Sequence, residues 1–321
     1  MIQTKSLWLD KPYYSLDAYF KDTFHHKCYK IALDAGMTCP NRDGSLDSRG
    51  CIFCSAGGSG DFAASPGAID RQLAEGLAKF GDKKVGDCFM AYFQAYTNTY
   101  APVEELRKIY TEALSHPQIC GISIATRPDC LGEDVLALLA ELKTGFPKKL
   151  IWVELGLQTI HKQTADYIRR GYPLSVFEEA AGHLQDIGIP YIVHVILGLP
   201  GETRGQMYET IQYLNRFSPF GIKLQLLHIL KGTDLATDYE AGLFPALEKE
   251  EYLDILIGCI ERLSPEIVLH RVTGDGPKAL LLAPTWSLNK RDVLNSLHKE
   301  MKNRQTYQGR LYHATGSTDT V

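Results

Sequence analysis

Short apolar runs alternate along most of the chain with segments whose apolar residues recur at helical spacing. Six runs are rich in β-branched and aromatic residues, which is typical of strands. These runs span residues 28–34, 88–96, 120–126, 150–157, 190–199 and 221–230. Helices are predicted at residues 68–80, 102–115, 132–143, 175–188 and 202–217. Pro102 begins one helical segment and Gly188 ends another, and both residues are common at those places.

A strand followed by a helix, repeated six times, predicts parallel strands joined by right-handed crossovers. Several runs are apolar on both faces, as a sheet covered by helices requires. We therefore expect an α/β protein, in first place a partial (β/α)6 barrel, although an open doubly wound sheet also fits. After the sixth strand, a helix is expected at residues 247–263, an extended piece at 266–272 and a last helix at 290–305.

This pattern divides the chain into a partial barrel over residues 28–265, an N-terminal extension over 1–27 and a C-terminal extension over 266–321. The C-terminal extension is expected to pack on the barrel and to be able to contact substrate. Helices are expected in both extensions.

Composition and charge exclude several classes of protein. With 45% hydrophobic and 22% charged residues and a net charge of -4, the 321-residue chain is neither disordered nor uniformly basic. Residues 290–313 carry six Lys and Arg against two acids, which suits either RNA phosphate or a solvated helix face. No secretory signal or membrane span is recognisable, so we expect a cytoplasmic protein without membrane contact.

The cysteines carry the chemical signal. Cys39, Cys51 and Cys54 follow the first predicted strand and converge on one loop, where thiolates select zinc or iron–sulfur chemistry. Three interpretations stay open. The loop holds structural zinc completed by Cys28, His25 or His26, a fully ligated cluster, or a [4Fe–4S] cluster with one open iron.

The remaining cysteines are expected to be core or surface thiols, which leaves a single metal centre. Cys28 falls at a strand. Cys88, Cys120, Cys130 and Cys259 are scattered along the sequence.

The segments "IATRPD", "VELGLQT", "RRGY" and "VILGLPGET" follow the cysteine loop, and together the chain resembles the radical S-adenosylmethionine (SAM) superfamily. The resemblance implies a partial barrel whose cysteine loop holds a [4Fe–4S] cluster, with SAM on the open iron. The common spacing is CxxxCxxC. This chain instead has eleven residues between Cys39 and Cys51, which resembles the Elongator catalytic subunit.

Further segments, "CPNRDGS", "HRVTGDGP" and "APTW", are similar to the YtqA/YhcC-type group within that superfamily. Membership implies modification of the tRNA wobble uridine, from a 5-carboxymethylaminomethyl to a 5-aminomethyl side chain. It also implies a one-electron reductant such as flavodoxin or ferredoxin, and allows an associated methyltransferase.

The resemblance assigns a role to individual residues, each with a structural alternative. Phe53 lies beside the SAM adenine or packs locally. Four residues after the second predicted strand stand where the family has a Gly-Gly-Glu-like loop that binds the methionyl amine. They are Gln94, Tyr96, Thr97 and Asn98. Glu154 and Gln158 stand where side chains of the family contact the SAM ribose.

Arginines are the candidates for carboxylate binding, because a guanidinium grips a carboxylate in two places. Arg127 and Arg170 are assigned to the carboxylate of SAM or of substrate, and Arg271, in a loop with Asp275, to substrate contact. Ordinary ion pairing is the alternative. Gly198 and Leu199 are assigned to the adenine.

Other functions remain as alternatives. The chain is either a radical SAM enzyme acting on another substrate or, in a different class, a zinc-stabilised RNA-binding or scaffold protein. The acetyl transfer of the Elongator subunit is not expected, because the part after the sixth strand is too short for an acetyltransferase domain.

Overall fold

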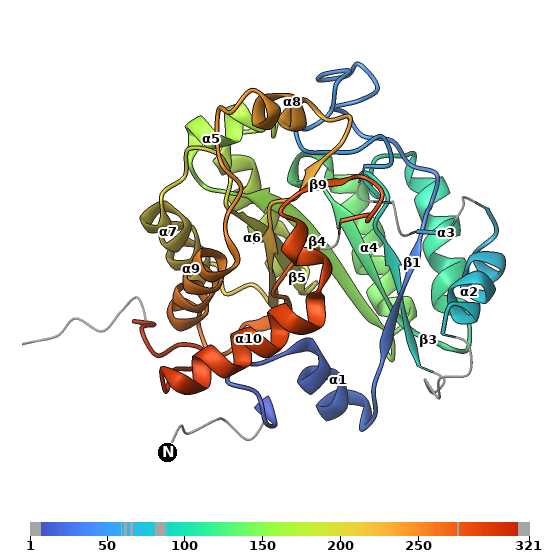
Figure 1. Cartoon of the computed structure of the whole chain (residues 1–321). Coiled ribbons are helices and arrows are strands. Elements are labelled where there is room, and N and C mark those ends of the chain that lie inside the picture. The colour runs from blue at the N-terminus through green and yellow to red at the C-terminus, as the bar shows by residue number, and fades with distance from the viewer. Residues whose placement is uncertain are drawn as a thin grey trace, which may run out of the picture. The chain divides into compact units, whose positions relative to one another are not determined.

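Seven strands form one sheet in the order β1-β2-β3-β4-β5-β6-β8 in the computed structural model, which describes residues 8–58, 60, 63–64, 67–80, 88–274 and 276–313 (Figure 1). The strands are β1 (Tyr29–Leu33), β2 (Phe89–Phe93), β3 (Ile119–Thr126), β4 (Leu150–Gln158), β5 (Tyr191–Leu197), β6 (Gly221–Leu226) and β8 (Val268–Arg271). The pairings of β1 with β2, β2 with β3, β3 with β4 and β6 with β8 are parallel.

All six predicted strands are confirmed, as are the α/β class and the partial-barrel topology. The extended piece at 266–272 adds β8 as a seventh strand. Every residue of β2 is buried, which is the pattern of a sheet covered on both faces.

The described chain divides into two compact units, and β5 contributes residues to both. One unit comprises residues 24–157 and 166–193. Its helices are α2 (Ile69–Ala78), α3 (Val103–Ser115), η2 (Pro128–Cys130), α4 (Glu133–Gly145) and α6 (Leu174–Asp186). In this unit α2 packs on β1 and α3 packs on β3, so the helices line one face of the strands (Figure 1).

The other unit comprises the described residues of 8–23, 158–165 and 194–313. Its elements besides the strands named above are α7 (Arg204–Asn215), β7 (Ile229–Leu230), α8 (Asp234–Glu240), α9 (Lys249–Arg262), β9 (Leu281–Ala283), η3 (Thr285–Leu288) and α10 (Lys290–Asn303). α7 and α10 both pack on α9, and β7 pairs antiparallel with β9. α1 (Leu16–Phe24) and α5 (Lys162–Tyr167) have residues in both units.

The predicted helix boundaries have local causes. Pro102 is the N-cap of α3, and Gly188 follows α6 with a φ of 65°, where its N–H bonds back to the carbonyl of Gln185. The predicted strand run 221–230 is divided into β6 and β7. The sequence does not predict α5, α8 or β9, because three to seven residues are too few to display a period. No helix among the described residues is long and apolar enough to cross a membrane.

Candidate metal centre and cofactor site

The cysteine loop begins after the carboxyl end of β1, as predicted. Cys39, Cys51 and Cys54 are all half-buried and free of disulfides. A tight turn places Cys51 beside Cys54, since the N–H of Cys54 donates to the carbonyl of Cys51 over 3.0 Å. The N–H of Arg42 donates to the carbonyl of Cys39 over 2.8 Å, so the chain turns back directly after the first cysteine.

Arg42 fastens the turn that carries the last cysteine. Its Nη2 donates to the carbonyl oxygens of Cys54, over 3.1 Å, and of Ser55. The guanidinium also lies 5.7 Å from the ring centre of Tyr96, whose hydroxyl donates to the carbonyl of Ala56. The end of β2 and the start of the cysteine loop therefore hold this turn from two sides.

Asn41 joins the loop to the "RRGY" segment. Its side chain is buried, and Nδ2 donates to the carbonyl of Arg169 over 2.7 Å and to Sγ of Cys51 over 3.4 Å. Gly171 has a φ of +81°, and a Cβ there would lie 2.8 Å from Oδ1 of Asn41. Only glycine fits between these groups without displacing the loop.

The thiols of the turn differ in acidity. Hydrogen bonding from Cys54, together with the nearby charges of Arg127 and Arg42 and the Asn41 amide, lowers the pKa of Cys51 to about 6. The reciprocal hydrogen bond raises the pKa of Cys54. Cys51 is therefore disposed to be a thiolate, which is the form that binds metals.

A second group of cysteines lies outside the loop. Among the described residues, the sulfurs of Cys28, Cys88 and Cys120 lie within 4.8 Å of one another. The expectation that Cys88 and Cys120 are scattered thiols is wrong, because parallel pairing brings the starts of β2 and β3 together with Cys28 at the start of β1.

Arg127 is nine-tenths buried, and its guanidinium fork is occupied by Asp129. Nε lies 2.9 Å from Oδ1 and Nη2 lies 2.7 Å from Oδ2, a two-point contact. Arg170 donates to the carbonyls of Tyr172 and Leu157, and both guanidinium groups lie over the Tyr172 ring. These contacts position the two arginines.

The segment after β2 is buried and polar. Gln94, Thr97 and Asn98 are all at most 9% exposed, whereas Phe53 and Tyr96 are half-buried. Nδ2 of Asn98 donates to the carbonyl of Ala125 over 3.0 Å. Oδ1 of Asn98 is buried without a hydrogen-bond partner among the described residues, so it can accept from a ligand.

Glu154 has a partner that the sequence does not reveal. Oε1 of Glu154, which is fully buried, lies 2.7 Å from Nζ of Lys30 and accepts a hydrogen bond from Ser123 over 2.6 Å. The pair stabilises the charge of a buried acid, which accounts for Glu154 without a ligand.

The remaining predicted residues lie in the other unit. Gln158 ends β4 with a φ of 69°, and its Oε1 is buried without a partner among the described residues. Gly198 follows β5, where a Cβ would meet Leu247, and it precedes the buried Leu199. Arg271 ends β8, and Asp275 is outside the described residues.

The basic segment at 290–313 is partly neutralised. Arg304 pairs with Asp254 and Glu300, and Arg310 pairs with Glu261. These pairs favour the interpretation of a solvated surface for the end of α10 and the residues that follow it.

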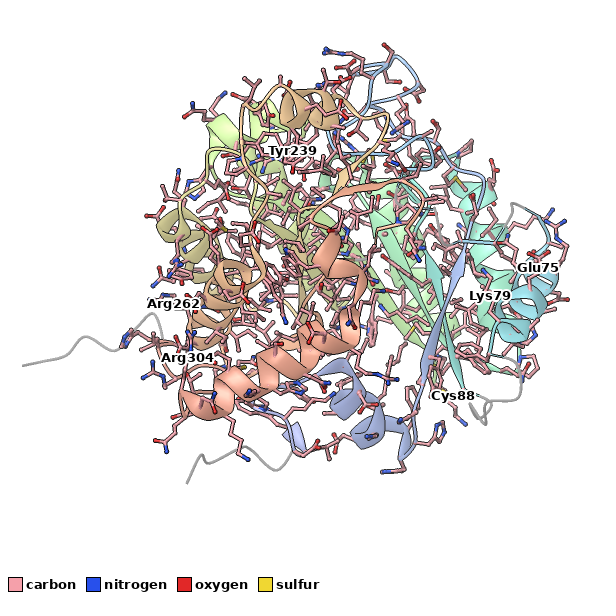
Figure 2. The ribbon with its side chains drawn as sticks, viewed as in Figure 1. Glu75, Lys79, Cys88, Tyr239, Arg262 and Arg304 are labelled. Carbon is pink, nitrogen blue, oxygen red and sulfur yellow. The ribbon has the colours of Figure 1, made fainter. Side chains whose placement is uncertain are left out.

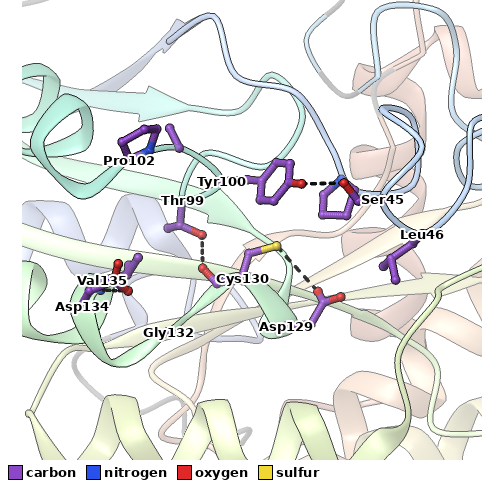
Figure 3. Close-up of a pocket in the computed structure, with 12 residues that line it drawn as sticks. Ser45, Leu46, Thr99, Tyr100, Pro102, Asp129, Cys130, Gly132, Asp134 and Val135 are labelled. Carbon is purple, nitrogen blue, oxygen red and sulfur yellow. Dashed lines mark hydrogen bonds between the residues drawn. The ribbon is translucent and has the colours of Figure 1, made fainter.

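A cavity of about 670 Å³ lies beside the cysteine loop (Figure 3). Pro40, Ser45 and Leu46 of the loop form one side, and the segments that follow β2 and β3, Thr99 to Pro102 and Asp129 to Val135, form the other. Thr99 donates to the carbonyl of Cys130 over 2.6 Å, and Ser45 shares a hydrogen bond with Tyr100 over 2.9 Å. The sequence gives no sign of this cavity. It also gives no sign of the roles of Asn41 and Arg42, although "CPNRDG" places both beside the first cysteine.

The chain matches two family models. The model of the radical SAM superfamily matches residues 48–214, slightly more than half of the chain, and that of the radical SAM C-terminal domain matches residues 219–303. The uncharacterised protein YtqA of Bacillus subtilis is 43% identical over 94% of each chain. YhcC of Escherichia coli is 37% identical over 83% of this chain and 85% of its own.

More distant relatives are longer. A tRNA uridine(34) acetyltransferase of Methanocaldococcus jannaschii is 27% identical over 56% of this chain. The matching region covers 32% of that protein. A structure of Methanocaldococcus infernus Elp3 has the same fold, with a TM-score of 0.64 at 16% identity over 88% of this chain and 64% of that one.

Radical SAM proteins use a [4Fe–4S] cluster, SAM and a one-electron reductant, and a loop with three cysteines provides the thiolates that such a cluster needs. On its family match and its identity to YtqA and YhcC, this chain belongs to the radical SAM superfamily.

Proposed function

We propose that the chain is a radical SAM enzyme that converts 5-carboxymethylaminomethyluridine at the tRNA wobble position to 5-aminomethyluridine. The observation that carries the catalytic part is the single loop on which Cys39, Cys51 and Cys54 gather, fastened by Asn41 and Arg42. The substrate part is supported by the similarity to a tRNA uridine(34) acetyltransferase.

In this proposal Cys39, Cys51 and Cys54 would hold the cluster. Together, the cluster and SAM would supply a 5'-deoxyadenosyl radical for hydrogen abstraction from the substrate. Oδ1 of Asn98 is buried and unpaired within the described chain, which suits an acceptor for the methionyl ammonium. Phe53, Gln94, Tyr96 and Thr97 are proposed to complete this side of the SAM site.

The remaining assignments follow the family. Gln158 is proposed for the ribose, Gly198 and Leu199 for the adenine, and Arg271 for the substrate carboxylate. The guanidinium of Arg127 is already paired with Asp129, so Arg127 is not proposed for that carboxylate. Arg127 and Arg170 are then positioning residues for the cysteine loop.

The overall reaction breaks the bond between the side-chain nitrogen and its carboxymethyl carbon. One hydrogen atom of that carbon would pass to the radical, a second electron to the oxidised form of the one-electron reductant, such as flavodoxin or ferredoxin, and a proton to solvent. Water then adds, so the products are the primary amine and glyoxylate. An associated methyltransferase would act on that amine.

The test is anaerobic reconstitution of wild type, Cys51→Ala and the control Cys259→Ala with iron and sulfide. Each protein is then given SAM, dithionite and tRNA that carries the carboxymethylaminomethyl group. Wild type and the control are expected to be brown and to form 5'-deoxyadenosine, and Cys51→Ala to lose most of the iron and the activity.

Mass spectrometry of the nucleosides tests the substrate. The wobble nucleoside is expected to lose its two-carbon unit. Deoxyadenosine without a change in the tRNA would overturn the substrate and keep the radical chemistry, whereas a colourless zinc protein would overturn both.

A further inference from the structure

A second group of thiols lies apart from the cysteine loop. The sulfurs of Cys28, Cys88 and Cys120 all lie within 4.8 Å of one another, and those of Cys28 and Cys120 are 3.2 Å apart. Cys88 is buried, and the other two are half-buried. We refer to these three residues as the thiol triad.

Parallel pairing creates the thiol triad. Cys28 directly precedes β1, Cys88 directly precedes β2, and Cys120 is the second residue of β3. Tyr29 pairs with Phe89, and Phe89 pairs with Ile119, so the three cysteines meet at the amino ends of adjacent strands. Figure 2 shows Cys88 at this end of the strands.

The thiol triad is separate from the cysteine loop. Cys28 precedes β1 whereas Cys39 follows it, and a five-residue strand spans about 16 Å. An ion bound by the triad therefore cannot share a ligand with the loop.

The spacing of the sulfurs fits one metal ion. A zinc–sulfur bond of about 2.3 Å at tetrahedral angles puts neighbouring sulfurs about 3.8 Å apart. The observed distances, from 3.2 Å to at most 4.8 Å, bracket that value.

A disulfide would join only two of the three thiols, whereas one metal ion uses all three.

We propose that Cys28, Cys88 and Cys120 bind one Zn²⁺ as thiolates, with water in the fourth position. Zinc accepts a tetrahedral thiolate site without a redox change, and the partial exposure of two of the cysteines lets water reach the ion. Binding releases the three thiol protons to solvent. The ion ties together the amino ends of three strands that support the cysteine loop at their other ends.

The experiment uses the full-length chain and a variant in which Cys39, Cys51 and Cys54 are all alanine. Both are purified with zinc, dialysed and analysed for metal. One zinc per chain is expected in both proteins. When Cys28→Ser and Cys120→Ser are added to the loop variant, the bound zinc is expected to be lost. When Cys130→Ser and Cys259→Ser are added instead, the zinc is expected to remain.

Absence of zinc from the loop variant would overturn the proposal. Retention of zinc after Cys28 and Cys120 are also replaced would overturn it as well. So would stoichiometric iron in the loop variant. These outcomes are independent of whether the cysteine loop supports radical chemistry.

A second measurement needs no variant and covers the case in which the serine proteins fail to fold. In zinc-loaded wild type, Cys28, Cys88 and Cys120 are expected to resist alkylation and to become reactive together when a strong chelator removes the metal. Peptide mass spectrometry reads out each cysteine. Alkylation of Cys28 and Cys120 before chelation, or a disulfide between them, would contradict the proposal.

Discussion

Nζ of Lys30 lies 2.7 Å from Oε1 of Glu154, and the two residues are 124 positions apart in the sequence. The hydroxyl of Ser123 donates to the same carboxylate oxygen, and Lys30 also lies 4.9 Å from the ring centre of Tyr92. A lysine on β1 and an acid on β4 thus share one buried polar site.

Lys30→Met is expected to lower the free energy of unfolding by about 3–5 kcal/mol, because the carboxylate of Glu154 stays buried without its partner. Glu154→Gln is expected to lower it by less, because the side chain of Lys30 is 18% exposed and can reach water. Urea unfolding of Lys30→Met and Glu154→Gln measures this loss. The double variant is expected to lose less than the two single losses added together. Lys79→Met, at an exposed position after α2, is the control and is expected to change stability by less than about 0.5 kcal/mol (Figure 2). Additive losses would argue against the pair.

Asn41→Ala is expected to reduce cluster loading by about 10-fold or more, because the variant loses the contacts to Cys51 and to the carbonyl of Arg169. Iron and sulfide per chain after anaerobic reconstitution give the readout, with circular dichroism to check the fold. Ser48→Ala, at an exposed position in the same loop, serves as the matched control. Equal loading of the two variants would show that Asn41 does not position the cysteines.

Alanine substitutions at two glycines are expected to change stability in opposite directions. Gly171→Ala places a methyl group 2.8 Å from Oδ1 of Asn41 at a φ of +81°, so we expect lower stability and poorer cluster loading. Gly182→Ala lies within α6 with no atom within 4 Å of the added methyl group, so it is expected to stabilise by about 0.5–1 kcal/mol. Thermal unfolding of the two variants measures the contrast, and a similar shift in both would contradict it.

His228 gives a prediction about pH. Burial, aided by the positive charges of Lys290 and Arg271, lowers the pKa of His228 to about 4. Gly274 and Gly276 lie against its ring, and a Cβ at either would come within 2.8 Å of it. Below about pH 6.5, His228 is therefore protonated in the unfolded chain but stays neutral in the folded chain. The free energy of unfolding falls as the pH drops from about 6.5 to 4.

The expected contribution of His228 is about 1.4 kcal/mol per pH unit in that interval. Urea unfolding between pH 7 and pH 4.5 should show a smaller loss of stability in His228→Asn than in wild type. His183→Asn, at an exposed position in α6, should follow wild type. Parallel curves for wild type and His228→Asn would exclude the effect.

The fold was predictable because the strands that build it are apolar on both faces. β2 illustrates this, since all five of its residues are buried. The pairing of β7 with β9 was not predictable, because strands of two and three residues leave no pattern of their own and β7 continues the predicted run 221–230.

Only those parts of the site whose residues lie close together in the sequence were predictable. Cys39, Cys51 and Cys54 share one loop, but the partner of Glu154 lies three strands away. The thiol triad did leave a signal, since each of the first three predicted strand runs begins with a cysteine. Parallel adjacent strands bring such first residues together, so the order of the strands was the missing information.

The N–H of Gly50 donates to the carbonyl of Asn41 over 2.6 Å, and this bond closes the base of the long spacer between the first two cysteines. Residues 42–49 are therefore an excursion whose two ends already meet, and Leu46 near its tip is 54% exposed. The cysteines that flank it are held as neighbours, as they would be in a short motif. The length and sequence of residues 43–49 can thus diverge between homologues while Arg42 and the cysteine positions stay fixed.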